Sequence, residues 1–160
     1  MPFLESQEYE GEELIERLGG WLGRGRAFRG RQIVAYHKNW IYFTELFGLD
    51  VVDYVEPKPG IPASGAHLSR LLEQLTPAPP AGIIRAPFEN EKPAHWLSDR
   101  LSIPMIEMAF TVGGSEEAAD LFSLYEQTIA AQVPDLETDL LPVKDEKSTD
   151  LALDEAGCRR

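Results

Sequence analysis

Cysteine is almost missing from this sequence. Cys158, close to the carboxyl end, is the only one among 160 residues. One cysteine cannot form an intramolecular disulfide, a Cys-rich zinc site or a Cys-Xaa-Xaa-Cys redox motif. Long apolar runs are missing too, because no stretch approaches the roughly 20 apolar residues of a membrane span. These absences exclude a disulfide scaffold and a cysteine-based zinc site.

Positive charge is also scarce. The chain has 15 lysines and arginines against 27 acidic residues, a net charge of −12 and a pI of about 4.6. A nucleic-acid-binding surface needs clustered basic side chains that displace counterions, so we expect no nucleic-acid partner. The one basic run, Arg24, Arg26, Arg29 and Arg31, is expected to form a solvated turn or to pair with nearby carboxylates.

Motifs for catalysis are not present. The sequence contains no Gly-Xaa-Ser-Xaa-Gly elbow, phosphate-binding loop, His-Glu-Xaa-Xaa-His pair or Gly-Xaa-Gly-Xaa-Xaa-Gly turn. Adjacent carboxylates such as Glu116-Glu117 and Asp145-Glu146 fit helix capping or solvation better than acid-base chemistry. The sequence therefore predicts a protein that is not an enzyme.

What is present is an alternation of short apolar runs with helical patterns, in a chain that is 43% hydrophobic and long enough for one domain with a core. Alternating strands and helices favour a parallel sheet with helices on both faces. We expect an α/β fold, a three-layer lobe with a four-stranded, mainly parallel sheet. The expected strands are Ile33–Ala35, Leu49–Val55, Gly82–Ile84 and Ile103–Met108. The expected helices are Glu12–Trp21, Asn39–Phe47 closed by Gly48, Gly65–Leu75 capped by Ser64, residues 91–100, and a last one from Ser115 to about Gln132.

His37 is the candidate functional residue. It follows the first strand directly, and ligands of open parallel sheets bind outside the carboxyl ends of the strands. A neutral imidazole is a good ligand for Zn²⁺ or Mn²⁺, but a zinc ion usually takes four ligands, or three and a water. The alternative role is a histidine hydrogen-bonded at a strand end. His67 is expected to face solvent or to lie beside a helix cap, and His95 is expected on a solvent-facing helix surface.

Four motifs follow one another in the first half of the chain: Tyr36-His37, the aromatic run Trp40–Phe43, Phe47-Gly48-Leu49 and Glu56-Pro57-Lys58-Pro59-Gly60-Ile61. In this order and spacing they resemble the metal-binding solute receptors of zinc and manganese ABC importers. The resemblance runs from about Glu12 to Val133 and covers only the carboxyl-terminal lobe of such a receptor.

The resemblance implies a transported Zn²⁺ or Mn²⁺ ion, with His37 as one of its ligands. It implies three partners: the metal ion, an ABC permease in the membrane, and an amino-terminal lobe that supplies two further ligands across a cleft. An acidic residue after the last strand often supplies the fourth, but here Met108–Gly114 contains no carboxylate, and Glu107 is expected inside the strand. A family loop that often reads Glu-Pro is Arg85-Ala86-Pro87 here, which puts a cation near the expected cleft.

The resemblance also suggests how the chain is divided. Residues 1–29 would be the end of an inter-lobe helix and a basic turn, and residues 30–133 the carboxyl-terminal lobe. Residues 134–160 carry eight acidic and four basic residues without periodicity, and are expected to form an acidic, disordered tail. Receptors of this family are periplasmic, but residues 1–6 lack the basic and apolar regions of a signal peptide. We therefore expect a fragment, a reading frame without its beginning, or a relative that is cytoplasmic if Met1 is the true start.

Two other functions are compatible with the sequence. A degenerate lobe that binds no metal could act as a protein-interaction module, and an exposed apolar surface where the second lobe should pack would favour this. An α/β enzyme would require a cluster of perturbed titratable groups around His37, which the sequence does not predict.

Overall fold

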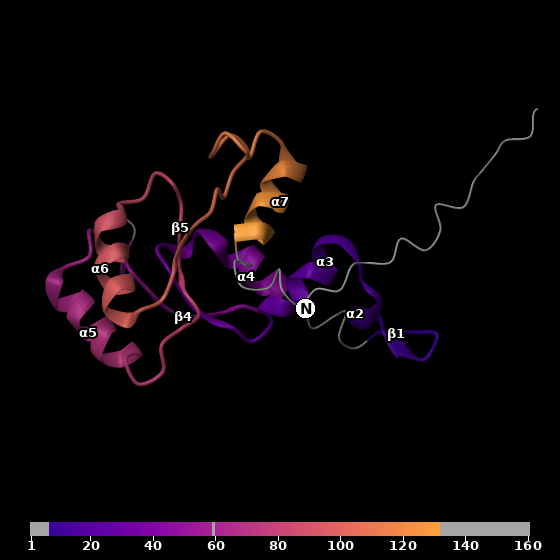
Figure 1. Ribbon diagram of the computed structural model, residues 1–160, viewed down its shortest axis with the longest axis horizontal. Helices are drawn as coiled ribbons and strands as arrows, with labels where there is room; N and C mark the ends of the chain where they lie inside the picture. The colour runs from indigo at the N-terminus through magenta and orange to yellow at the C-terminus, as the bar shows by residue number, and fades with distance from the viewer. Residues whose placement is uncertain (1–6, 59, 132–160) are drawn as a thin grey trace, which may run out of the picture.

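The structure is a computed structural model that describes residues 7–58 and 60–131. The expected tail at 134–160, with Cys158, lies outside the described residues. Four parallel strands form the central sheet in the order β4-β3-β5-β6 (Figure 1). Their bounds are β3 Gln32–Ala35, β4 Asp50–Tyr54, β5 Ile83–Arg85 and β6 Met105–Glu107. The α/β fold with a four-stranded parallel sheet is confirmed.

The helices that connect these strands cover both faces of the sheet. Between β3 and β4 the chain forms η2 (Lys38–Trp40) and α4 (Ile41–Phe47), which ends at Gly48 in the left-handed conformation, as predicted. Helix α5 (Gly65–Leu75) begins at Ser64, whose hydroxyl accepts a hydrogen bond from the His67 amide. The last two are α6 (Glu91–Leu101) and α7 (Leu121–Ala131).

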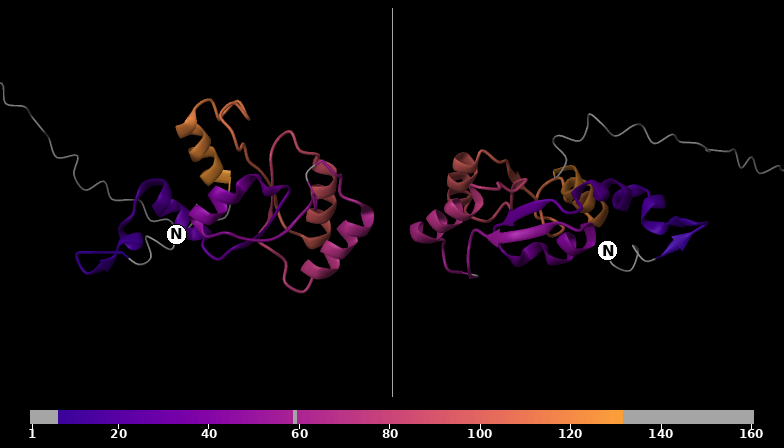
Figure 2. Two further views of the ribbon diagram at one scale, coloured as in Figure 1. Left: turned by 180° about the vertical axis from the view of Figure 1, so that it is seen from behind. Right: turned by 90° about the horizontal axis from the view of Figure 1, so that it is seen from below.

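Two apolar clusters fill the spaces between the sheet and its helices. One joins Val34 and Ile83 to Leu71 and Leu97 on α5 and α6. The other joins Ile33 and Ile84 to residues of α4 and α7. Because neighbouring residues of a strand point to opposite faces, Ile33 and Val34 divide between the clusters. Figure 2 shows α5 and α6 together at one end of the molecule, away from α4 and α7.

The amino-terminal segment differs from the prediction. Instead of one helix over Glu12–Trp21, it contains a small antiparallel pair, β1 (Glu8–Tyr9) with β2 (Glu12–Glu13), and two short helices, α2 (Leu14–Arg17) and α3 (Gly20–Gly25). A 3-10 turn, η1 (Arg26–Phe28), follows. The chain is extended at Leu18 and has a positive φ of 57° at Gly20, which interrupts the helix. The apolar residues keep helical spacing across this break, so the spacing alone predicted one continuous helix.

The last helix begins later than predicted. Residues 115–120 are not helical, and α7 starts at Leu121. Residues 115–118 form a local turn, in which the Ser115 hydroxyl accepts a hydrogen bond from the Ala118 amide. The side chain of Asp120 then accepts from the Ser123 amide while the Ser123 hydroxyl accepts from the Asp120 amide, a reciprocal cap that sets the start of α7.

Burial varies along α7. Ile129 is fully buried, whereas Leu121 and Phe122 are exposed. Among the described residues, no helix is long and apolar enough to cross a membrane.

Candidate functional site

The candidate site lies where β3, β4 and β5 end. Backbone pairing continues one or two residues past the strands: the Tyr36 amide donates to the Ile84 carbonyl at 2.8 Å, and the Glu56 amide donates to the Tyr36 carbonyl at 3.1 Å. His37 is the next residue after Tyr36 and precedes η2. The parallel register therefore brings His37 and Glu56, which are 19 positions apart in the sequence, to the same edge of the sheet.

The side chains of Tyr36 and His37 both contact the carboxylate of Glu56. The Tyr36 hydroxyl donates to Oε1 of Glu56 at 3.1 Å, and Nε2 of His37 lies 3.1 Å from Oε2 of the same carboxylate. The His37 and Glu56 side chains are 20% and 12% exposed. The imidazole is thus held by a nearly buried carboxylate while part of its ring still reaches the surface.

The environment of Tyr36 disfavours its ionisation. Burial raises the pKa of the Tyr36 hydroxyl above its ordinary value, and the hydrogen bond to Glu56 and the negative charges of Glu56 and Glu89 raise it further. A phenolate here would lose solvation and meet two carboxylates. Tyr36 is therefore a hydrogen-bond donor at this site.

A second carboxylate, Glu89, comes from the loop after β5. It is buried, and its oxygens accept hydrogen bonds from the Asn39 side chain at 2.9 Å and from the Ala86 amide at 2.7 Å. Burial raises the pKa of Glu89 above the usual range, although the hydrogen bond from the Ala86 amide and the positive charge of Arg85 oppose the shift. The buried carboxyl ties η2 to the loop after β5.

Arg85 lies near this edge of the sheet, and its guanidinium is occupied by other partners. Its guanidinium is buried and donates to the carbonyl oxygens of Ala86, at 3.0 Å, and Glu89, at 2.9 Å, and to the carboxylate of Glu107. The sequence placed a cation close to the expected cleft. The structure shows that its hydrogen bonds hold the loop 86–89 together and that Glu107, at the end of β6, pairs with it.

The other two histidines lie apart from His37 and Glu56. His67 is beside the cap of α5, as predicted, and both ring nitrogens have partners: Nε2 is 3.0 Å from the Tyr54 carbonyl and Nδ1 is 3.2 Å from Arg70. His95 has a 59% exposed side chain on α6, as predicted, 3.5 Å from Asp99. His37 is the histidine placed at the carboxyl edge of the sheet, and its role as a metal ligand stays a prediction.

The titratable cluster around His37 was not predicted from the sequence. The structure brings Tyr36, Glu56, Glu89 and Arg85 into its neighbourhood. Glu56 could have been found, because it follows a strand whose carboxyl end must lie beside that of β3. Glu89 had no such signal, because its position depends on the path of a loop. Within residues 7–58 and 60–131, no group of three or more His, Cys, Asp and Glu side chains is arranged to hold a metal ion.

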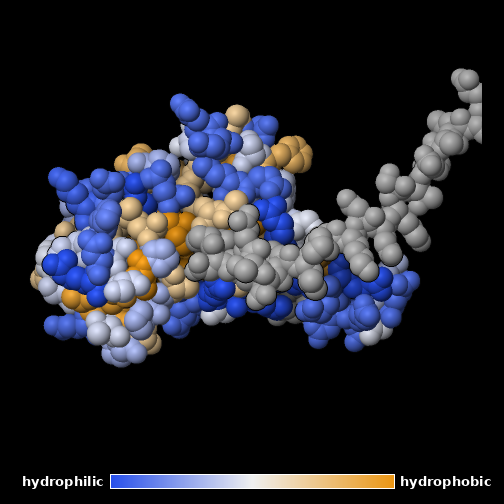
Figure 3. All heavy atoms as spheres, viewed as in Figure 1, coloured by the Kyte–Doolittle hydropathy of each residue, from blue (hydrophilic) through white to orange (hydrophobic). Residues whose placement is uncertain are grey.

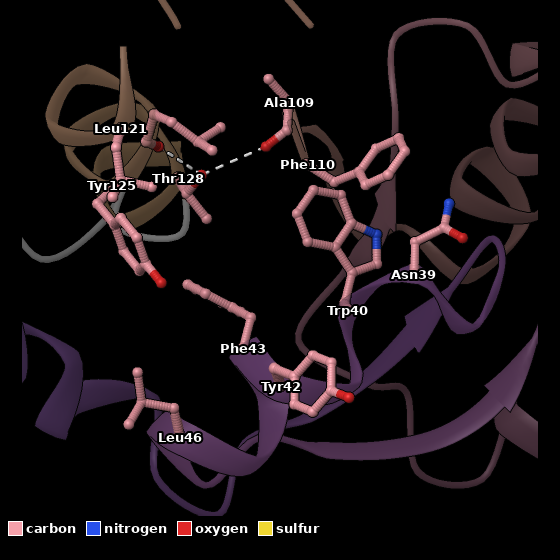
Figure 4. Close-up of a pocket in the computed structure, with 11 residues that line it drawn as sticks. Asn39, Trp40, Tyr42, Phe43, Leu46, Ala109, Phe110, Leu121, Tyr125 and Thr128 are labelled. Carbon is pink, nitrogen blue, oxygen red and sulfur yellow. Dashed lines mark hydrogen bonds between the residues drawn. The ribbon is translucent and has the colours of Figure 1, made fainter. Parts of the chain in front are cut away.

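A pocket of about 460 Å³ lies between α4 and α7 and is also lined by residues of η2 (Figure 4). Its walls are mainly aromatic and aliphatic. Trp40, Phe43 and Tyr125 face the hollow, Phe110 closes one side of it, and the Thr128 hydroxyl bonds to backbone carbonyls. Asn39 belongs to this lining and also bonds to Glu89, so it joins the pocket to the His37 site.

The aromatic residues of the Tyr36–Phe43 segment differ in burial. Tyr36 and Trp40 are buried, and Phe43 packs partly against the core. Tyr42 is 88% exposed at the pocket. Most of these side chains are therefore core or lining.

Comparisons with known proteins agree with this architecture. No protein-family model and no curated protein matches the sequence. Among solved structures, the chain is similar to the SBP, or solute-binding protein, FpvC from Pseudomonas aeruginosa in complex with Mn²⁺, with 18% identity and a TM-score of 0.51. A structure of FpvC with a Ni²⁺ ion gives 18% identity and a TM-score of 0.54.

The chain has the fold of a solute-binding-protein lobe. Each match covers 70% of this chain but only 44% and 41% of the FpvC chains. The chain therefore spans less than half the length of the solved structures that it matches.

Proposed function

We propose that the chain is the carboxyl-terminal lobe of a solute-binding protein of an ABC importer, and that its cargo is a Zn²⁺ or Mn²⁺ ion. The observation that carries the proposal is the position of His37, partly exposed at the carboxyl edge of the parallel sheet and held there by Glu56. The similar solved structures, with Mn²⁺ and with Ni²⁺, support a divalent metal as cargo.

Under this proposal His37 supplies one ligand and residues 30–133 form the lobe. The part of the chain that the structure describes brings together no set of three metal ligands, which fits a site shared with a second lobe. Reversible coordination and closure of two lobes would capture the ion, and a membrane permease would receive it. The same proposal places the protein in the periplasm.

The local charge supports a cationic cargo. Glu56 and Glu89 both approach His37, while the guanidinium of Arg85 is paired with Glu107 and loop carbonyls. The negative charge of a carboxylate close to a ligating imidazole favours a cation bound at that imidazole. The site thus offers a divalent cation an imidazole with carboxylates close to it.

The test is a titration of the purified full chain, with Cys158 replaced by serine, by Zn²⁺ and by Mn²⁺. Because one lobe gives an incomplete ligand set, we expect weak binding at one equivalent, lost in His37→Ala and kept in His95→Ala. Mn²⁺ should broaden the NMR signals of Tyr36, His37 and Glu56 before others, because its unpaired electrons act at short range. Binding unaffected by His37→Ala would overturn the proposal.

A second candidate function is a protein-interaction module without metal, and one observation favours it. Large apolar side chains are exposed around the pocket: Tyr42, Phe110, Leu121 and Phe122 are 88%, 40%, 56% and 70% exposed. Figure 3 shows apolar surface over the middle of the molecule, while the end with β1 is hydrophilic. Sedimentation of the metal-free chain tests this. Self-association that Leu121→Ser abolishes, together with no metal effect at His37, would favour the module.

A further inference from the structure

We propose that the pocket between α4 and α7 is a binding site for a small, uncharged aromatic molecule whose one hydrogen-bond acceptor bonds to the indole N–H of Trp40. The pocket volume of about 460 Å³ lies within the range of small-molecule sites, about 300–1,000 Å³. Neither His37 nor Glu56 is among the described residues that line the pocket. The inference therefore goes beyond the proposed metal function and does not depend on it.

The walls of the pocket decide the charge of the ligand. The described residues that line it include no Asp, Glu, Lys, Arg or His side chain. An ion placed here would lose hydration without gaining a partner of opposite charge, and such a transfer is costly. The ligand that suits these walls is therefore uncharged.

The walls also decide the shape of the ligand. Trp40, Phe43 and Tyr125 face the hollow, and Phe110 closes one side of it (Figure 4). Trp40 meets Phe43 and Phe110 edge to face, with ring centroids 6.4 and 6.1 Å apart. Aromatic pairs in such geometries gain energy beyond that of the buried area. A further aromatic ring in the hollow thus finds ring faces and edges to pack against.

One polar atom in these walls has no partner. Trp40 is 4% exposed, and its Nε1 is buried without a hydrogen-bond partner among the described residues. A buried N–H without an acceptor is destabilising, and an acceptor that reaches it removes the penalty. In Figure 4 the Nε1 edge of the indole lies on the side of Asn39 and Phe110, which also belong to the lining. This unpaired donor calls for an acceptor on the ligand.

Two other polar groups of the lining are already occupied. The Thr128 hydroxyl donates to a backbone carbonyl of α7 at 2.7 Å, and the Asn39 side chain donates to Glu89 at 2.9 Å. The Trp40 N–H differs from both because its hydrogen bond is unmade. It is therefore the group that fixes the orientation of the ligand.

The ligand reaches the indole past Phe110. Phe110 is 40% exposed and Leu121, at the start of α7, is 56% exposed, so this part of the lining meets solvent. Exposed side chains change rotamer on the picosecond to nanosecond timescale. A turn of the Phe110 ring therefore opens the Nε1 edge of Trp40 without unfolding the core.

The experiment is ¹H–¹⁵N and ¹H–¹³C NMR of the metal-free full chain, with acetophenone as the probe and ethylbenzene as its match without an acceptor. Both probes should shift the methyl signals of Leu121 and Leu124. Only acetophenone should move the indole N–H signal of Trp40 downfield, and it should bind about 3- to 10-fold more tightly than ethylbenzene. Methyl signals that neither probe shifts, or equal affinities with an unmoved indole signal, overturn the proposal.

A third probe, benzyltrimethylammonium, tests the charge of the ligand. Aromatic walls also attract cations, and the net charge of −12 would draw a cation toward the protein. We expect this cation to bind more weakly than acetophenone, because the described lining offers it no anion. Tighter binding of the cation overturns the assignment of an uncharged ligand.

The variant Trp40→Phe tests the hydrogen bond. It keeps an aromatic ring and removes the N–H, so it should erase the preference for acetophenone over ethylbenzene. A preference that persists in a folded Trp40→Phe overturns the role of the N–H. If this variant does not fold, the indole signal of the wild-type protein decides.

A pair of charge variants tests the location. Leu121→Asp puts a charge at the rim and should weaken the binding of both probes about 10-fold. An acidic side chain is favourable in the first turn of a helix, so α7 should persist. Ile61→Asp adds the same charge at an exposed position outside the described lining and should bind as wild type does. Equal binding by the two variants overturns the proposal.

Two further measurements separate this site from the other possibilities. His37→Ala should bind both probes as wild type does, so a failure of the metal function leaves this test intact. Sedimentation of the same samples tests a second copy of the chain as the occupant. Signals of Leu121 and Leu124 that move with protein concentration, in a dimer that no longer binds the probes, overturn the small-molecule site.

Discussion

Arg85 and Glu107 are cross-strand partners in the register of β5 and β6, and the guanidinium of Arg85 donates to the carboxylate of Glu107. The Arg85 side chain is 7% exposed, whereas that of Glu107 is 51% exposed. The pair therefore combines a buried cation with an anion that still meets solvent. It ties the edge strand β6 to the sheet and gives the cation near the site a partner on the side of β6.

The first prediction concerns this pair. Glu107→Gln should lower the free energy of unfolding by about 1–2 kcal/mol, because the buried guanidinium loses a charged acceptor that is only half shielded from solvent. Urea unfolding followed by tryptophan fluorescence measures the change. Glu73→Gln, on the exposed surface of α5, should change the stability by less than about 0.5 kcal/mol. Equal values for the two variants would mean that the pair adds nothing.

The second prediction is a pH dependence from Glu89. The pKa of Glu89 is raised in the folded state, so the folded protein binds the carboxyl proton of Glu89 more tightly than the unfolded chain does. The contribution of Glu89 to stability is then present below the unfolded-state pKa of about 4.3 and is lost as the pH rises through the folded-state value. Replacing the carboxyl with an amide removes this loss.

Glu89→Gln should therefore gain stability relative to wild type as the pH rises from about 4 to neutrality. The Asn39 amide can rotate to accept from the new amide, while the glutamine oxygen accepts from Ala86. The measurement is the difference in urea midpoint between the two proteins at several pH values. A difference that is constant with pH would show that Glu89 titrates alike in both states.

The third prediction tests the end of α4. Gly48 has φ of 72°, and an added Cβ would lie 3.0 Å from Cγ of Arg29. Gly48→Ala should destabilise the fold by about 1–2 kcal/mol, because L-residues with side chains disfavour the left-handed region. Gly65→Ala, at the first position of α5 with open space around it, should be neutral or stabilising by up to about 1 kcal/mol. Thermal unfolding of both variants gives the comparison.

The fourth prediction tests how α3 packs on α4. An added Cβ on Gly25 would lie 2.0 Å from a ring carbon of Phe47, which is itself buried. Gly25→Ala should cost about 1–3 kcal/mol or more, because the ring must move within a filled core. Gly19→Ala, which has open space around it, serves as the control in the same denaturation series. A Gly25→Ala protein as stable as the control would show that α3 is not packed on Phe47 in solution.

Local sequence patterns determined most of the elements around His37. The apolar run before Tyr36, the glycine after Phe47 and the serine before α5 each predicted a boundary that the structure has. These signals are local, because a strand buried on both faces, a left-handed C-cap and a side-chain N-cap depend on a few neighbouring residues. The order of strands and helices then led to a parallel sheet.

Local sequence patterns did not predict the amino-terminal segment or the start of α7 correctly. The predicted helix over Glu12–Trp21 was wrong because periodicity persists across the break at Leu18 and Gly20. The start of α7 was placed too early because Ser115, with Glu116 and Glu117, has the residues of a cap, but Asp120 and Ser123 form the cap that is used. Periodicity and composition cannot choose between two competing caps.

The sequence alone determined that a parallel α/β lobe forms and that His37 stands at its carboxyl edge, since both follow from local patterns and from strand order. Only the tertiary structure decided that Glu56 and Glu89 approach His37 and that Arg85 pairs with Glu107. These contacts join residues that are 18 or more positions apart. They depend on strand register and on the path of loops, which long-range packing sets and local sequence does not.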